Sequence, residues 1–137
     1  MKFRPAIKKD YQTIITILKD VDEDYKDQTL DNFYVAEEKG QIAGVVKLKN
    51  YDNFFFLSSL AVSQNHQKRG IASFILKELI KKSDKSIYLY TIIPEFFKKF
   101  GFKITKQKSF LPSKNSLECE NCFPGKCVCM VKEGTVA

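Results

Sequence analysis

The stretch FFFLSSLAVSQNHQKRGIASFILKELIKK occupies residues 54–82, and its periodicity changes halfway along. Its first part, Phe54 to Val62, is aromatic and aliphatic and predicts a buried strand. From Ile71 onward the apolar residues recur at helical spacing, with charged residues opposite them. The segment between these two parts, residues 63–70, is polar. A strand, a polar loop and an amphipathic helix in this order predict an α/β unit in which the helix packs on a sheet.

The flanking sequence predicts further strands around this unit. Lys39-Gly40-Gln41 and Asp52-Asn53 are turn signals between strand-like segments, which favours an antiparallel meander. Asp10 is the predicted N-cap of an earlier helix, and Pro94 begins a short later helix. The predicted strands cover Lys2–Ala6, Phe33–Glu38, Ile42–Tyr51, Phe54–Val62, Ser86–Thr91, Phe102–Phe110 and Cys127–Lys132.

Length and composition are those of one globular domain, predicted to span residues 1–137. No apolar run approaches the roughly 20 residues that cross a bilayer, and the N-terminus has no apolar signal core. We therefore expect a cytoplasmic protein without membrane contact. The net charge of +7 comes mainly from Lys spread along the chain, and only two of the 23 basic residues, Arg4 and Arg69, are Arg. This favours a solvated surface over a single basic patch.

The loop before the second helix has the chemistry of a phosphate site. A helix N-terminus offers unpaired amide N–H groups and partial positive charge. Gly70 lets a phosphate approach the backbone closely, and Lys68 and Arg69 add positive charge. On spacing alone, an ordinary turn remains an equal alternative.

Three motifs, in the right order and at the right separations, resemble those of the GCN5-related N-acetyltransferase (GNAT) family. Gln67-x-x-Gly70-x-Ala72, after a strand that ends Leu60-Ala61-Val62, is similar to the acetyl-CoA motif of that family. The segment 96–102, FFKKFGF, resembles its aromatic-x-Lys-x-Gly-Phe signature, and the turn at 39–41 matches a family hairpin. The resemblance covers residues 1 to about 110. It implies an α/β fold with a mixed, mostly antiparallel central sheet flanked by helices.

The resemblance also implies where acetyl-CoA binds. The amides of the loop would hold the pyrophosphate, and the strand from Ser58 to Val62 would pair with the pantetheine arm. The thioester would lie between that strand and Ser86–Thr91. The implied cofactor-binding residues are Leu60, Ala61, Val62, Gln67, Lys68, Arg69, Gly70, Ile71, Ala72 and Phe97.

The implied reaction is attack of a primary amine on the thioester in a ternary complex. The backbone N–H of Val62 is the expected oxyanion donor. Many relatives carry Tyr where this chain has Phe97, which cannot donate a proton. Tyr90 or Tyr88 is the nearest substitute acid, with a core aromatic as the alternative for both. His66 is interpreted as a solvated loop residue near the phosphates rather than as a base.

All four cysteines fall in a Cys-rich C-terminal segment at about 111–137. Cys119, Cys122, Cys127 and Cys129 could close a tetrahedral zinc site, and the alternative is reduced or partly oxidised thiols. The same segment resembles a short GNAT branch related to N-acetylglutamate synthase. That branch suggests the α-amine of an amino acid as acceptor, and a homodimer is common in the family.

Two other functions compete with a catalytic N-acetyltransferase. The Phe at position 97 favours a non-catalytic acyl-CoA-binding or sensor domain. A basic zinc-knuckle module would explain the charge and the cysteines together. It lacks interleaved aromatics and Arg, so we expect no nucleic-acid partner.

Overall fold

The computed structural model describes residues 1–21, 29, 31–67, 69–111 and 127–134. The strands and the helices α1, α2 and α3 follow one another in the order that the sequence predicts. The bounds are β1 Lys2–Pro5, η1 Lys8–Asp10, α1 Tyr11–Asp20, β2 Phe33–Glu38, β3 Gln41–Asn50, β4 Phe54–Val62, η2 Gln64–His66, α2 Ile71–Lys82, β5 Ser86–Thr91, α3 Pro94–Lys98, β6 Lys103–Thr105 and β7 Val128–Lys132.

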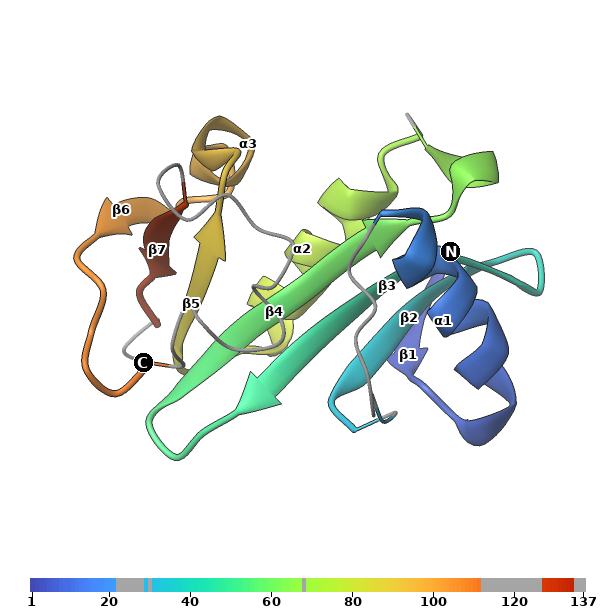
Figure 1. The fold of residues 1–137 in the computed structure, drawn as a ribbon, viewed down its shortest axis with the longest axis horizontal. Coiled ribbons are helices and arrows are strands. Elements are labelled where there is room, and N and C mark those ends of the chain that lie inside the picture. The colour runs from blue at the N-terminus through green and yellow to red at the C-terminus, as the bar shows by residue number, and fades with distance from the viewer. Residues whose placement is uncertain (22–28, 30, 68, 112–126, 135–137) are drawn as a thin grey trace.

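The strands form one mixed sheet in the order β1-β2-β3-β4-β5-β7-β6 (Figure 1). The pair β4–β5 is parallel, and the remaining neighbours are antiparallel. Because parallel neighbours need a crossover connection, α2 carries the chain from β4 to β5. The predicted α/β class with a mostly antiparallel sheet is confirmed.

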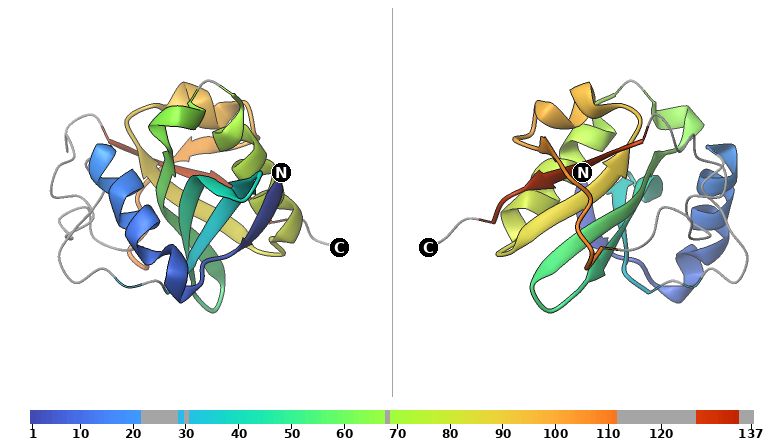
Figure 2. Two further views of the ribbon diagram at one scale, coloured as in Figure 1. Left: turned by 90° about the vertical axis from the view of Figure 1, so that its right-hand side faces the viewer. Right: turned by 60° about the vertical axis from the view of Figure 1, so that its left-hand side comes forward.

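Two apolar cores lie on opposite faces of this sheet. Figure 2 shows α1 on one face and α2 on the other. Ile14, Ile17 and Leu18 of α1 pack on β2, β3 and β4. Ile71 and Ile75 of α2 belong to the larger core on the other face, which extends to β5 and α3. Because each helix buries its apolar stripe against the sheet, the stripe predicted from the spacing in α2 is confirmed.

The hairpin between β2 and β3 is a tight two-residue turn. Lys39 and Gly40 both have positive φ, 52° and 80°, and Glu38 pairs with Gln41. Positive φ at both central positions is the geometry that suits the twist of a two-residue hairpin. The turn predicted at residues 39–41 is therefore present, and it fixes the last residue of β2, Glu38, opposite the first residue of β3, Gln41.

The predicted strand at 102–110 is shorter than expected. Within this range Lys103–Thr105 forms the strand, and its pairing with β7 ends at Thr105–Cys129, one residue short of the start of β7 at Val128. The chain then turns, with the Leu111 N–H donating to the Lys108 carbonyl at 3.2 Å. No helix within the described ranges is long and apolar enough to span a membrane.

Candidate functional site

The sheet opens between β4 and β5. The two strands pair from Phe54–Ser86 to Leu57–Leu89 only, although β4 runs on to Val62 and β5 to Thr91. Figure 1 shows the two strands diverging beyond the paired part. The β5-facing main chain of β4 is therefore unpaired by the sheet over residues 58–62, and it can receive an extended ligand.

A β-bulge lies where the opening begins. Leu48 pairs with Leu57, but the next pair is Lys47 with Ser59, so Ser58 is an extra residue in β4. A bulge bends its strand and increases the local twist, which turns the rest of β4 away from β5. The Ser58 Oγ atom is buried and has no hydrogen-bond partner among the described residues.

The register also decides which amides face the opening. The Ser63 N–H donates to the Ala43 carbonyl at 2.8 Å, and Gly44 pairs with Val62 next to it. Hydrogen-bonded and non-hydrogen-bonded pairs alternate in an antiparallel ladder. The Val62 main chain therefore points away from β3, toward the opening, and Leu60 repeats this orientation two residues earlier. The residue between them, Ala61, pairs with Val45 of β3, and its side chain lies in the core under α1.

The loop from β4 to α2 ends in a left-handed glycine. Gly70 has φ 78° and is the N-cap of α2, whose first turn has no side-chain cap. The amides of that turn therefore have no capping side chain and are available to an anion. A Cβ placed on Gly70 would meet nothing within 4 Å. The glycine is thus required by its backbone conformation, and the space above it is open.

The other residues predicted to form this loop site have different surroundings. Gln67 is exposed, and its Nε2 donates to the Val62 carbonyl at 3.5 Å. Arg69 is exposed, and its Nη2 donates to Glu38 Oε1 at 2.7 Å. Ile71 is buried in the core, and Ala72 is half-buried. Lys68 lies outside the described residues.

The aromatic candidates lie on both faces of the sheet. Tyr90 is half-buried on the α1 face, with its ring centroid 5.3 Å from that of Phe56. Tyr88 lies on the same face against Phe54. Phe97 is buried in the larger core on the α2 face. Its role there is packing, and its contact with a cofactor stays a prediction.

His66 contradicts the solvated interpretation. It is only 8% exposed, at the end of η2, and its Nδ1 atom is buried without a partner among the described residues. The sequence shows seven polar residues in a row before Gly70 and gives no sign that the chain turns there into a short helix. The turn, closed by the His66 N–H on the Ser63 carbonyl at 2.9 Å, directs the imidazole inward.

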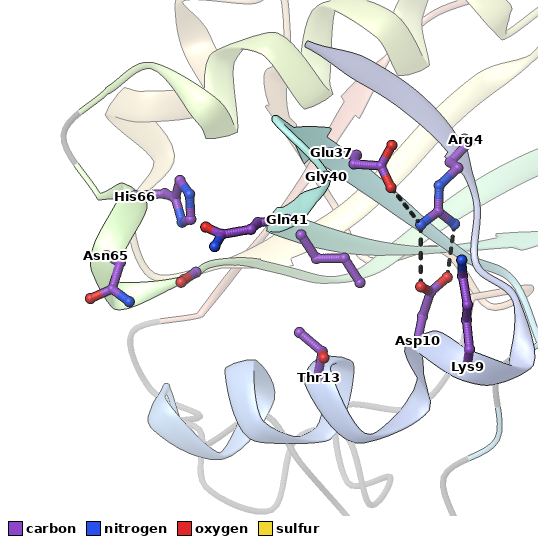
Figure 3. Close-up of a pocket in the computed structure, with 11 residues that line it drawn as sticks. Arg4, Lys9, Asp10, Thr13, Glu37, Gly40, Gln41, Asn65 and His66 are labelled. Atoms are coloured by element: carbon purple, nitrogen blue, oxygen red, sulfur yellow. Dashed lines mark hydrogen bonds and ion pairs between the residues drawn. The ribbon is translucent and has the colours of Figure 1, made fainter.

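His66 also lines a hollow of about 430 Å³ between the first turn of α1, the β2–β3 hairpin and η2. Figure 3 shows Arg4 at the far end, paired with Asp10 and Glu37. Arg4 Nη1 lies 2.8 Å from Asp10 Oδ2, and Arg4 Nη2 lies 3.1 Å from Glu37 Oε1. The hydrogen bond with Asp10 raises the pKa of Arg4 despite its partial burial. The same bond lowers the pKa of Asp10, and the Ile7 N–H reinforces the shift against the effect of burial.

This network changes the interpretation of two sequence features. Asp10 does precede α1 as predicted, but its carboxylate bonds Arg4 and Ile7 and does not cap the helix. Arg4, one of the two arginines, ties β1 to η1 and β2 and is occupied in doing so. One guanidinium thus faces two carboxylates at this end of the hollow, which Lys9 also lines.

The cysteine site can be followed only in part. Cys119 and Cys122 lie outside the described residues. Cys127 and Cys129 are buried, and Cys129 packs with Phe54, Phe56 and Leu111. No group of three or more potential ligands that could hold a metal occurs within the described part of the chain. Nothing in that part supports the predicted zinc.

The pattern of the acetyltransferase (GNAT) domain family matches residues 29–104, more than half of the chain. Solved structures share the fold. N-acetylglutamate synthase from Neisseria gonorrhoeae, complexed with coenzyme A and N-acetyl-glutamate, matches with a TM-score of 0.76 and 18% identity over 98% of this chain and 35% of the synthase. This chain thus spans about a third of the synthase.

Two matched structures are nearer to this chain in length. Rv2747 from Mycobacterium tuberculosis, in complex with CoA, matches with a TM-score of 0.74 and 16% identity, over 98% of this chain and 100% of its own. Ard1 from Thermoplasma volcanium matches with a TM-score of 0.72 and 18% identity, over 98% of each chain. At these identities the likeness is one of fold.

Proposed function

Since this chain belongs to the GNAT family of acetyltransferases, we propose that it transfers the acetyl group of acetyl-CoA to a primary amine. The observation that carries the proposal is the opening between β4 and β5, with an uncapped helix N-terminus at its end. An unpaired strand edge fits the amide-bearing pantetheine arm, and the helix terminus fits a pyrophosphate.

In this proposal the main chain does most of the binding. The outward-facing groups of Leu60 and Val62 would hydrogen-bond the pantetheine arm, and the amides of 67–72 would hold the phosphates. The Val62 N–H is proposed to stabilise the oxyanion as the amine attacks, because it faces the opening. Such positioning by fixed backbone groups can supply much of the rate.

Proton transfer is assigned to Tyr90. The amine attacks in its neutral form and its nitrogen gives up a proton to water. The C–S bond breaks as the tetrahedral intermediate collapses, and the leaving thiolate takes a proton from the acid. Tyr90 stands on β5, across the opening from β4, and its hydroxyl is the candidate donor. Phe97 supplies no proton and is buried in the core.

The acceptor is proposed to be an amino acid. The support is the fold shared with N-acetylglutamate synthase, whose crystal structure contains coenzyme A and an N-acetylated amino acid. A second support is the resemblance of the C-terminal segment to the branch of the family that is related to this synthase.

Release of the CoA thiol with a panel of amines tests the proposal. The panel should hold amino acids, polyamines and peptides with free N-termini. Amine-dependent release, with the acetylated amine identified by mass spectrometry, is the expected result. If CoA binds but no amine is acetylated, the chain is a non-catalytic acyl-CoA-binding domain. If CoA does not bind, the proposal is wrong altogether.

A further inference from the structure

The arginine of the phosphate loop is already held by a carboxylate. Arg69 Nη2 lies 2.7 Å from Glu38 Oε1, a short charge-assisted hydrogen bond. Arg69 directly precedes Gly70, the N-cap of α2, and so stands beside the proposed pyrophosphate site. The cation that the sequence assigns to the phosphates is therefore shared with the β2–β3 hairpin.

The two partners differ in how firmly they are placed. Glu38 ends β2, is fixed by its pairing with Gln41 across the tight turn, and has a side chain only 18% exposed. The Arg69 side chain is 52% exposed. A long, half-exposed side chain changes rotamer at low cost, whereas a carboxylate fixed at the end of a strand does not. Any exchange of partners would therefore move Arg69.

The carboxylate is also incompletely satisfied. Glu38 Oε2 is buried and has no hydrogen-bond partner among the described residues. A guanidinium can bond both oxygens of a carboxylate or of a phosphate, yet the observed contact uses one carboxylate oxygen. The single bond is thus weaker than the bidentate contact that a phosphate would accept.

We propose that Glu38 competes with the phosphates of CoA for Arg69 and so determines how tightly the cofactor binds. The inference rests on the proposed function. When CoA binds, Arg69 turns from Glu38 to the phosphates, and the carboxylate is left beside a new anion. Both the broken bond and the repulsion between the anions cost binding energy. When CoA leaves, Glu38 recaptures Arg69, which favours release of the product.

Titration calorimetry with CoA tests this in wild type, Glu38→Gln, Arg69→Gln and the double variant. Glu38→Gln should tighten CoA binding by about three- to tenfold. The gain should shrink as salt is raised. Glu78→Gln is the matched control, because it removes the same charge from a side chain of α2 paired with Lys81. It should bind CoA as wild type does.

The double variant separates exchange from simple repulsion. If Glu38 acts through Arg69, most of the gain from Glu38→Gln disappears when Arg69 is already Gln. A gain that persists in full would show repulsion alone and overturn the inference. Unchanged or weaker binding in Glu38→Gln would overturn it too. Absence of CoA binding in wild type would instead overturn the proposed function, so the two failures are distinguishable.

Discussion

At the scale of single residues, Gly70 shows how one backbone conformation places the phosphate loop. A Cβ there would meet nothing within 4 Å, so a substitution is opposed by the φ of 78° and not by crowding. Gly70→Ala should lower the free energy of unfolding by about 1 kcal/mol and weaken CoA binding. Gly70→Asn should lose less stability, because Asn tolerates this conformation. Urea denaturation measures the stability of both variants, and a Gly70→Ala variant as stable as wild type would contradict this explanation.

The role of Tyr90 is tested by removing one oxygen. Tyr90→Phe keeps the ring that packs at 5.3 Å on Phe56 and deletes the proposed proton donor. We expect kcat to fall by about 10²-fold or more, with an unchanged KM for acetyl-CoA. Tyr88→Phe, on the same strand and face, serves as the control and should retain its kcat. Equal rates for Tyr90→Phe and wild type would identify Tyr90 as a packing aromatic only.

The pair of half-buried Arg4 and buried Asp10 should make stability depend on pH. The hydrogen bond from Arg4 lowers the pKa of Asp10 below its ordinary value in the folded state. A group with a lowered folded pKa stabilises fully above its unfolded pKa, about 4, and this stability is lost as the pH falls through the folded value. Asp10→Asn should therefore cost about 2 kcal/mol at pH 7, and its deficit should narrow below about pH 4.

Chemical denaturation across this pH range measures the effect. Glu95→Gln is the control, since its pair with Lys98 is exposed and should contribute no more than about 0.5 kcal/mol. A deficit for Asp10→Asn that stays constant down to pH 2 would show that the carboxylate gains nothing from Arg4.

Individual side chains were the least predictable level from sequence. Glu38 is one of many acidic residues in the sequence, and its partner Arg69 lies 31 residues away. The burial of His66 follows from a turn within a polar segment, where no apolar residue indicates that the chain folds back. Conversely, the sequence does single out Gly70, for the close approach of a phosphate to its backbone, although its φ of 78° comes from the structure. Contacts between residues far apart in the sequence cannot be found from local sequence patterns, whereas turn glycines can.

At the scale of elements, α2 lies unusually close to β3. A Cβ on Gly44 would stand 2.9 Å from Ile71 Cγ2 and 3.2 Å from the Ala61 carbonyl oxygen. Gly44→Ala should push the start of α2 away from the sheet and lower the free energy of unfolding by about 1–2 kcal/mol. Because Ile71 is the first residue of α2, CoA affinity should fall as well. Calorimetry at a temperature where the variant remains folded separates these effects, and unchanged CoA affinity would show that the phosphate loop does not depend on this contact.

Strand and helix bounds were largely predictable from sequence. The bounds of β2, β4 and β5 agree with the predicted ranges, and α2 begins at Ile71 as predicted, because turn residues or a change of period mark these positions. The bulge at Ser58 was not predictable, because it depends on the pairing of β4 with β3. The β4 sequence has apolar residues on both faces, so its pattern does not show where an extra residue is inserted. The short length of β6 likewise follows from its pairing with β7, which ends at Thr105–Cys129. The site's opening thus rests on pairing geometry that no single segment encodes.

At the scale of the whole molecule, the opening divides the sheet into two parts. Strands β1 to β4 form one part, and β5, β7 and β6 form the other. Four residue pairs at the start of β4 and β5 join the two parts within the sheet, and α2 packs across them on one face. A ligand that pairs with β4 inside the opening would add bonds where the sheet itself has none.

Bound CoA should therefore stabilise the protein as a unit and protect one place most. At a CoA concentration 100 times its Kd, linkage alone raises the free energy of unfolding by about 2.7 kcal/mol, which shifts the thermal midpoint upward by several degrees. Hydrogen exchange should slow beyond this global effect at Leu60, at Val62 and in the first turn of α2, because these amides face the ligand and acquire partners, whereas the Ala61 amide is already paired with β3. The edge strand β1 serves as the internal control, since it lies far from the opening in the strand order. A thermal shift with uniform protection, or with protection confined to β1 and β2, would place the cofactor elsewhere than between β4 and β5.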